Sequence, residues 1–241
     1  MDRAANGDPH AQTALGYIYY RGDGTPKDLN RAFIWFNMAA EAGDPEGECN
    51  AAYMLVHAEG TNANLEEALA MYRDAAAKGW VQAQFNLGHM YSDGLGVEQD
   101  WIQAAGWYEQ AMKGGSVPAC YRLGVIRETG KAGPPDPAGA AEIYQRCAKV
   151  GYDKAAVRLA LLYVEGRGVQ RNLGMAVKHL TTAAKNNNAE AMLWLGKMSL
   201  SGEGMVKSKR NAQQWLSKAA ARGNKEAGTL LDSLTEESLH R

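Results

Sequence analysis

The stretch Trp80–Gly115, WVQAQFNLGHMYSDGLGVEQDWIQAAGWYEQAMKGG, decides the fold because its pattern recurs in phase along the chain. Its marker positions are Ala83, Leu87-Gly88, Tyr91, Gly94, Gly96, Val97, Asp100, Ala104, Trp107, Ala111 and Gly115. Six copies of this 36-residue unit follow one another without a gap, at 8–43, 44–79, 80–115, 116–151, 152–187 and 188–223. A strict period of this length predicts stacked helical units that bury their apolar faces against their neighbours.

Each copy is interpreted as two amphipathic helices joined by a turn, because its apolar residues recur three and four positions apart. Glycines such as Gly94 and Gly96 in the turn permit positive φ. We expect Tyr91 and Trp107 to fill the space between the helices. Asp28, Asp100 and Asp136 occupy the same repeat position, which predicts caps at a helix start rather than a catalytic pair.

On these recurring positions the chain resembles the Sel-one-like repeat family, a relative of the tetratricopeptide repeat. The resemblance runs from Asp8 to Leu231. It implies an all-α fold, a right-handed α-solenoid superhelix of helix-turn-helix repeats, and an adaptor or scaffold that binds other proteins. Bacterial members are common, so the resemblance favours a bacterial envelope or secreted location over the cytoplasm.

We expect one repeat array over 1–241 with no internal boundary. Residues 1–7 match the end of a second helix, as if a preceding unit were cut, and a removed leader stays open. Residues 224–241 are predicted to form a capping helix over Asn224–Leu234 and a polar tail. Leu230, Leu231 and Leu234 leave a homo-oligomeric contact open.

The net charge of −1 conceals two halves of opposite sign. Residues 1–120 contain 16 Asp/Glu and 7 Lys/Arg, a net charge of −9, whereas residues 121–241 contain 11 and 19, a net charge of +8. Such a distribution favours a bipolar partner or head-to-tail contacts, both weakened by salt, although undirected drift of surface charge remains the alternative. The basic half has no Lys/Arg stripe interleaved with exposed aromatics, so no nucleic-acid partner is predicted.

The sequence contains no recognisable arrangement of catalytic, metal-binding or cofactor-binding residues. None of the five histidines lies in a metal-binding spacing, so neither a metal site nor a cofactor is predicted. The Gly-x-Gly pairs are repeat turns rather than phosphate loops, and no catalytic residue is identified. No apolar run approaches 18 residues, so no membrane span is expected.

The three cysteines, Cys49, Cys120 and Cys147, are not regularly paired. Cys120 lies early in a first helix and Cys147 late in the antiparallel second helix, so a bridge between them is allowed. Buried thiols are the preferred interpretation.

A candidate binding surface follows the first helices, which line the concave groove in the related tetratricopeptide stack. The predicted groove residues are Thr13, Tyr17, Tyr20, Tyr53, His57, Phe85, His89, Tyr121 and Glu128. The aromatic members are typical of binding hot spots, although burial against the next unit would also explain some of them. The partner predicted is a protein or peptide with apolar anchors near Lys/Arg.

Three function classes stay open at this stage. The first is a non-enzymatic protein-binding adaptor, the second an immunity protein that neutralises a secreted bacterial toxin, and the third a hydrolase acting on cell-wall-type substrates. The third class needs a nucleophile and a base within hydrogen-bonding reach, and no Ser/His or Cys/His pair is spaced to supply them.

Overall fold

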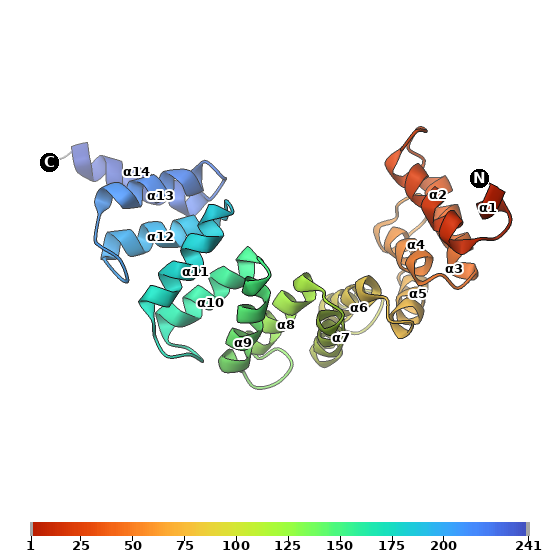
Figure 1. Cartoon of the computed structure of the whole chain (residues 1–241), viewed down its shortest axis with the longest axis horizontal. Coiled ribbons are helices and arrows are strands. Elements are labelled where there is room, and N and C mark those ends of the chain that lie inside the picture. Colours follow the sequence, from red (N-terminus) through yellow and green to blue (C-terminus); the bar gives the residue numbers. More distant parts are fainter. Residues whose placement is uncertain (1, 240–241) are drawn as a thin grey trace. The chain divides into compact units, whose positions relative to one another are not determined.

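The computed structural model describes residues 2–239, and the side chains as far as Thr235. Fourteen helices and no strand lie within that range, which confirms the all-α class (Figure 1). Each repeat contributes a first and a second helix. The first helices are α2 (Pro9–Arg21), α4 (Pro45–His57), α6 (Val81–Asp93), α8 (Val117–Thr129), α10 (Asp153–Glu165) and α12 (Ala189–Ser201). The second helices are α3 (Leu29–Glu41), α5 (Leu65–Ala77), α7 (Trp101–Lys113), α9 (Pro137–Lys149), α11 (Leu173–Lys185) and α13 (Lys209–Ala220).

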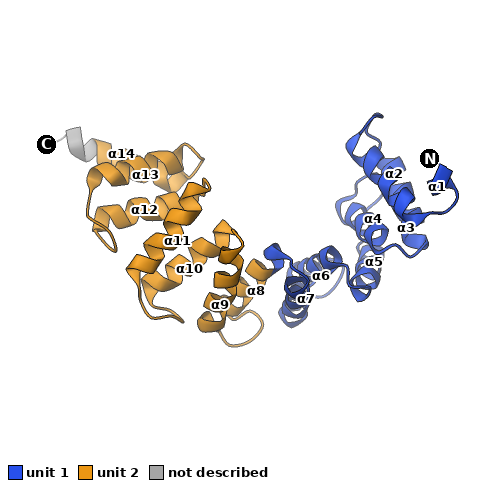
Figure 2. Cartoon of the chain, viewed as in Figure 1, with its two compact units in different colours: residues 1–119 blue, residues 120–241 orange. Residues whose placement is uncertain are grey.

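The helices pack in the order in which the chain makes them. Within a repeat, the first helix packs on the second, as seen for α2 on α3, α4 on α5, α6 on α7, α10 on α11 and α12 on α13. Between repeats, the second helix packs on the next first helix, as seen for α3 on α4, α5 on α6, α9 on α10 and α11 on α12. The chain divides into two compact units, residues 1–119 (unit 1) and residues 120–241 (unit 2), with the boundary inside α8 (Figure 2). The same boundary divides the acidic half of the sequence from the basic half, so unit 1 has a net charge of −9 and unit 2 a net charge of +8. A single uninterrupted array stays a prediction.

The Leu-Gly pair of the repeat marks the closest approach between the two helices of a hairpin. A Cβ atom added at Gly16 would lie 2.5 Å from the Phe36 ring, and one at Gly88 would lie 2.6 Å from the Tyr108 ring. Both rings are almost fully buried. Glycine is required there because the ring of the second helix occupies the place of a side chain.

Tyr91 and Trp107, predicted to fill the space between the helices, pack against the core but are themselves only half-buried. The position after the tryptophan carries the buried side chain instead. In the six repeats it is Phe36, Tyr72, Tyr108, Tyr144, Leu180 and Leu216, each at most 2% exposed. An amphipathic pattern locates the buried stripe but leaves adjacent positions at its edge ambiguous.

The two glycines of a turn such as Gly94-Leu95-Gly96 serve different purposes. Gly94 ends α6 in the left-handed conformation, with φ at 69°, and its N–H donates to the Met90 carbonyl. A Cβ added at Gly96 would lie 2.8 Å from the Leu65 carbonyl oxygen of the preceding repeat. In the second repeat Ala58 adopts φ 54° without a glycine, whereas Gly60 is retained against Leu29.

The predicted caps are confirmed. Asp28 accepts from the Arg31 N–H at 3.0 Å, Asp100 from the Gln103 N–H at 3.0 Å and Asp136 from the Gly139 N–H at 2.8 Å. Each carboxylate satisfies a backbone donor that the first turn of a helix leaves without a partner, which is why an acid recurs at this position.

Cys120 and Cys147 form a disulfide, so the preferred interpretation as buried thiols is wrong. Their Cα atoms are 6.1 Å apart because α8 and α9 run side by side within one hairpin. Such a distance lies in the range that a disulfide spans. Cys49 is free and buried in unit 1.

The terminal helices differ in part from the sequence prediction. Helix α1 (Asp2–Ala5) buries Ala4 and packs on α2, as expected for the end of a second helix. Helix α14 (Lys225–Leu239) packs on α13 and continues five residues beyond Leu234, where a polar tail was predicted. His240 and Arg241 lie outside the described residues.

The turn at Ala58 provides a test of these backbone roles. Ala58→Gly should stabilise the protein by about 1 kcal/mol, because a left-handed conformation costs a residue with Cβ about 1–2 kcal/mol and glycine recovers most of it. Gly60→Ala should destabilise it by about 1–3 kcal/mol, because its Cβ would meet the Leu29 backbone. Urea unfolding followed by circular dichroism measures both, and an unfavourable effect of Ala58→Gly would contradict the assignment.

The disulfide is tested by counting thiols. Denatured protein should expose one reactive thiol without reductant, that of Cys49, and three after reduction. Because the bridge closes a 27-residue separation, Cys147→Ser should lower the free energy of unfolding by about 3–4 kcal/mol in the chain-entropy model. Three reactive thiols before reduction would show that the bridge is absent.

Candidate binding groove

Two adjoining cavities open on the first helices of unit 1. The first has a volume of about 240 Å³ and is lined by Tyr17, Tyr20, Phe36, Cys49, Asn50, Tyr53, Met54, Gln82 and Asn86. The second has a volume of about 420 Å³ and is lined by Tyr53, Val56, His57, Tyr72, Gln82, Phe85, Asn86, His89, Met90, Asp93 and Leu95. They share Tyr53, Gln82 and Asn86. Together they form one surface across α2, α4 and α6, which we call the unit 1 groove.

Tyr17 is fixed at the first cavity by contacts from three directions. Its hydroxyl donates to Glu46 at 2.9 Å and accepts from the Asn50 amide at 3.0 Å. Its ring meets Phe36 edge-on with the centroids 5.2 Å apart. Desolvation, the largest cause, raises the pKa of Tyr17, so the hydroxyl stays protonated and remains a donor.

Tyr20 is held in the same way from the next turn of α2. Its hydroxyl donates to Glu59 at 2.9 Å. Burial, followed by the hydrogen bond to Glu59, raises the pKa of Tyr20 to about 12. Since each of these tyrosines is tied to a carboxylate of the next repeat, the rings are oriented before any partner arrives.

The second cavity is lined by aromatic and imidazole rings in contact with each other. The Tyr53 and His57 centroids are 4.3 Å apart, and those of Phe85 and His89 are 4.8 Å apart. Tyr53 is 39% exposed, one of the large apolar side chains of unit 1 that face solvent. The cavity therefore offers rigid rings with few rotatable bonds, which bind at a low entropy cost.

Two predicted groove residues are not available on the surface. Thr13 is 3% exposed, and its hydroxyl donates to Asp44 at 2.6 Å. Glu128 is 5% exposed and lies in unit 2. Both side chains contact the next repeat, which supplies Asp44 to Thr13 and Arg158 to Glu128.

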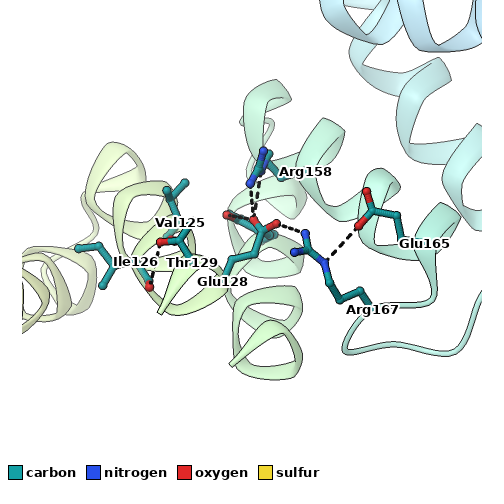
Figure 3. Close-up of polar contacts among 8 residues, drawn as sticks. Val125, Ile126, Glu128, Thr129, Arg158, Glu165 and Arg167 are labelled. Atoms are coloured by element: carbon teal, nitrogen blue, oxygen red, sulfur yellow. Dashed lines mark hydrogen bonds and ion pairs between the residues drawn. The ribbon is translucent and has the colours of Figure 1, made fainter. Parts of the chain in front are cut away.

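The carboxylate of Glu128 is the centre of a polar network (Figure 3). It accepts from the Tyr144 hydroxyl at 2.8 Å and from Arg158 Nη2 at 2.7 Å, and it forms an ion pair with Arg167. Arg167 also contacts Glu165 at 3.1 Å. These contacts join α8, α9 and the end of α10, so Glu128 links the fourth and fifth repeats.

Tyr121, also in unit 2, is half-buried and lines neither cavity. Its ring contacts Tyr144 and Tyr152, with centroids 6.0 and 5.5 Å away. Six predicted residues are therefore brought together in unit 1, namely Tyr17, Tyr20, Tyr53, His57, Phe85 and His89.

The sequence prediction missed the amides of the groove. Asn50 and Asn86 lie 36 residues apart at one repeat position, and Asn86 directly follows the predicted groove residue Phe85. Gln82 lies one helical turn before Asn86. That recurrence was the available signal. Phe36, whose ring is buried against Gly16, also forms part of the wall of the first cavity.

The groove has little reactive chemistry. Burial raises the pKa of the Cys49 thiol to about 12, so the sulfur is held as the poorly nucleophilic thiol. Among residues 2–239, no cluster of three or more His, Cys, Asp or Glu side chains is arranged to hold a metal ion. Within the same range, no helix is both long and apolar enough to span a bilayer.

A family model described as "Sel1 repeat" matches the chain six times in succession, at residues 9–44, 45–80, 81–116, 117–152, 153–188 and 189–224. The phase agrees with the period read from the sequence to within one residue. No curated protein matches the chain.

Several solved structures share the fold. The protective antigen c5321 of uropathogenic Escherichia coli, described as displaying an SLR fold, matches 96% of this chain with a TM-score of 0.89 and 29% identity. This chain spans half of that structure's length. A Sel1 repeat protein from Oxalobacter formigenes has a TM-score of 0.81 and 30% identity, covering 90% of this chain and 89% of its own. The immunity protein Pa5087 from Pseudomonas aeruginosa has a TM-score of 0.50 and 16% identity, covering 88% and 81%, a likeness of fold alone.

The role of Glu128 as a link between repeats predicts a stability effect. Glu128→Gln should lower the free energy of unfolding by about 1–3 kcal/mol, because Arg158 and Arg167 lose their buried counter-charge. The effect stays below that of a fully buried pair because both arginines are partly solvated. Urea unfolding measures it.

Glu165→Gln is the matched control, since it removes the other carboxylate that pairs with Arg167, one that lies at a half-exposed site. It should change the free energy of unfolding by less than about 1 kcal/mol. Equal effects of the two substitutions would contradict the linking role of Glu128.

Proposed function

Because the chain belongs to the Sel1 repeat family, whose repeats generally mediate protein–protein interaction, we propose that it is a non-enzymatic binding module whose unit 1 groove takes a segment of a partner protein. The observation that carries the proposal is the pair of adjoining cavities across α2, α4 and α6. Their aromatic rings are positioned by the scaffold, as in interface hot spots, where such rings contribute most of the binding free energy.

The shape of the groove favours an extended or helical segment over a compact ligand. Two cavities that share Tyr53, Gln82 and Asn86 can take two neighbouring side chains of one peptide. The amides between them are suited to hydrogen bonds with a peptide backbone, because each carries both donors and an acceptor. The groove thereby combines apolar anchoring with polar orientation.

The charge of unit 1 selects among partners. A net charge of −9 attracts basic segments and accelerates their association, an effect that salt screens. We therefore expect a partner segment that carries Lys or Arg beside its apolar anchors.

The other two function classes have less support. A hydrolase would need an activated nucleophile in the groove, and the Cys49 thiol there has its pKa raised rather than lowered. The likeness to the immunity protein Pa5087 extends to fold alone, so it gives no support for that function in this chain.

The proposal predicts which surface substitutions abolish partner capture. Tyr53→Ala and Phe85→Ala should each reduce capture of the partner from host cells at least about tenfold, because each removes a ring from the cavities. The matched control is Ile102→Ala on α7, an apolar side chain that is 70% exposed and lines neither cavity.

Capture is quantified by mass spectrometry at low and high salt, with thermal unfolding recorded for each variant. The expected partner is retained by Ile102→Ala, is lost with both groove variants and binds less at high salt. Equal capture by all four proteins, at matched stability, would exclude the unit 1 groove as the binding surface.

A further inference from the structure

We propose that the first cavity of the unit 1 groove is an aromatic cage for an alkylammonium group, and that in the partner this group is the side chain of a lysine. The inference rests on the proposed function, because it names one anchor of the segment that the groove binds. It adds a recognition chemistry that the repeat itself does not require.

The rings around the cavity are the first reason. Four of its nine lining residues are aromatic, and they come from three helices: Tyr17 and Tyr20 from α2, Phe36 from α3 and Tyr53 from α4. A cation near the face of such rings is attracted by their quadrupoles, and several rings around one small space are the arrangement that binds ammonium groups. The remaining lining residues are apolar, amide or thiol side chains, none of which bears a charge at neutral pH.

The carboxylates behind the rings are the second reason. Glu46 and Glu59 accept the hydroxyl protons of Tyr17 and Tyr20, each through a single oxygen atom. No Lys, Arg or His within residues 2–239 forms an ion pair with either carboxylate. Two negative charges are therefore joined to the rings through hydrogen bonds and lack a basic counter-charge, so they increase the attraction of the rings for a cation.

The chain's own cations show that these rings attract positive charge. The Arg21 guanidinium lies 5.0 Å from the Tyr17 ring centroid, and the Lys27 ammonium lies 5.4 Å from that of Tyr20. Both side chains are exposed and neither lines the cavity, so the cage itself stays open. They oppose a further cation, whereas the net charge of −9 on unit 1, which already includes both, favours one.

The lining distinguishes ammonium from guanidinium. A guanidinium is planar and is recognised best by a carboxylate that accepts two of its N–H groups, and no carboxylate lines this cavity. An ammonium is compact and can use the amide oxygens of Asn50 and Asn86 together with the ring faces. A volume of about 240 Å³ accommodates such a group with part of its alkyl chain.

The experiment is a titration of the full chain with three small probes, followed by NMR of the Asn50 and Asn86 side-chain amides. The probes are Nα-acetyl-lysine N-methylamide, its Nε-trimethyl form and the neutral norleucine counterpart. We expect both cations to shift these amides, with the trimethyl form binding at least as tightly. The norleucine probe should bind about tenfold more weakly, because it lacks the charge that the rings attract.

Glu59→Gln should weaken binding of the lysine probe about threefold or more, because it removes a charge while keeping an acceptor for Tyr20. The matched control is Glu66→Gln, which removes the same charge from an exposed site on α5 that lines neither cavity. Binding that is unchanged in Glu59→Gln, or weakened equally in both variants, would overturn the role of the carboxylate.

Four further outcomes would overturn the proposal. The first is equal binding of the norleucine and lysine probes, and the second is no shift of the Asn50 or Asn86 amide signals. The third is tighter binding of the corresponding arginine probe. The fourth is binding of choline chloride over a hundredfold tighter than the lysine probe, which would assign the cavity to a free solute. Partner capture that is lost in Tyr53→Ala and Phe85→Ala while all probes fail would leave the proposed function standing without the cage. Probe binding without any groove-dependent capture would remove the proposed function and, with it, the assignment to a partner lysine.

Discussion

In four of the six repeats a side chain from the second helix packs on the glycine of the Leu-Gly pair, and this contact is the constraint on which the rest of the structure depends. In the second and fifth repeats Ala52 and Ala160 occupy that position. Phe36 on Gly16, Tyr108 on Gly88 and Tyr144 on Gly124 leave no room for a Cβ atom. Because the ring sits where a side chain would otherwise stand, the two helices of a hairpin have a fixed spacing. A fixed hairpin gives each following repeat the same surface to pack on.

That regularity is what builds the unit 1 groove. Residues one repeat apart, such as Asn50 and Asn86, come to equivalent places on successive first helices. Hydrogen bonds from Tyr17 to Glu46 and from Tyr20 to Glu59 then tie the groove side chains of one repeat to the next. The scaffold thus orients the rings in advance, so that a partner would not have to supply the free energy for ordering them.

Much of the fold could be predicted from the sequence because the period repeats most local signals in several of the six units. Caps such as Asp28 and Asp100 were correctly assigned for the same reason. Contacts between repeats could not be predicted in this way. Thr13 and Glu128 have groove-like positions on their helices but are covered by Asp44 and by Arg158 of the next repeat. The disulfide between Cys120 and Cys147 likewise depends on the packing of one particular hairpin.

Some positions of the first helices are therefore covered by the next repeat, as at Thr13 and Glu128. Others, such as Tyr53, line the unit 1 groove and are open to a partner. Under the proposed function, the aromatic rings of this surface contact the partner directly. Intermolecular NOEs between a captured partner and isotopically labelled protein test it most directly. We expect NOEs to the rings of Tyr17, Tyr53 and Phe85. NOEs confined to exposed side chains of the second helices, such as Ile34 and Ile102, would show that the partner binds elsewhere.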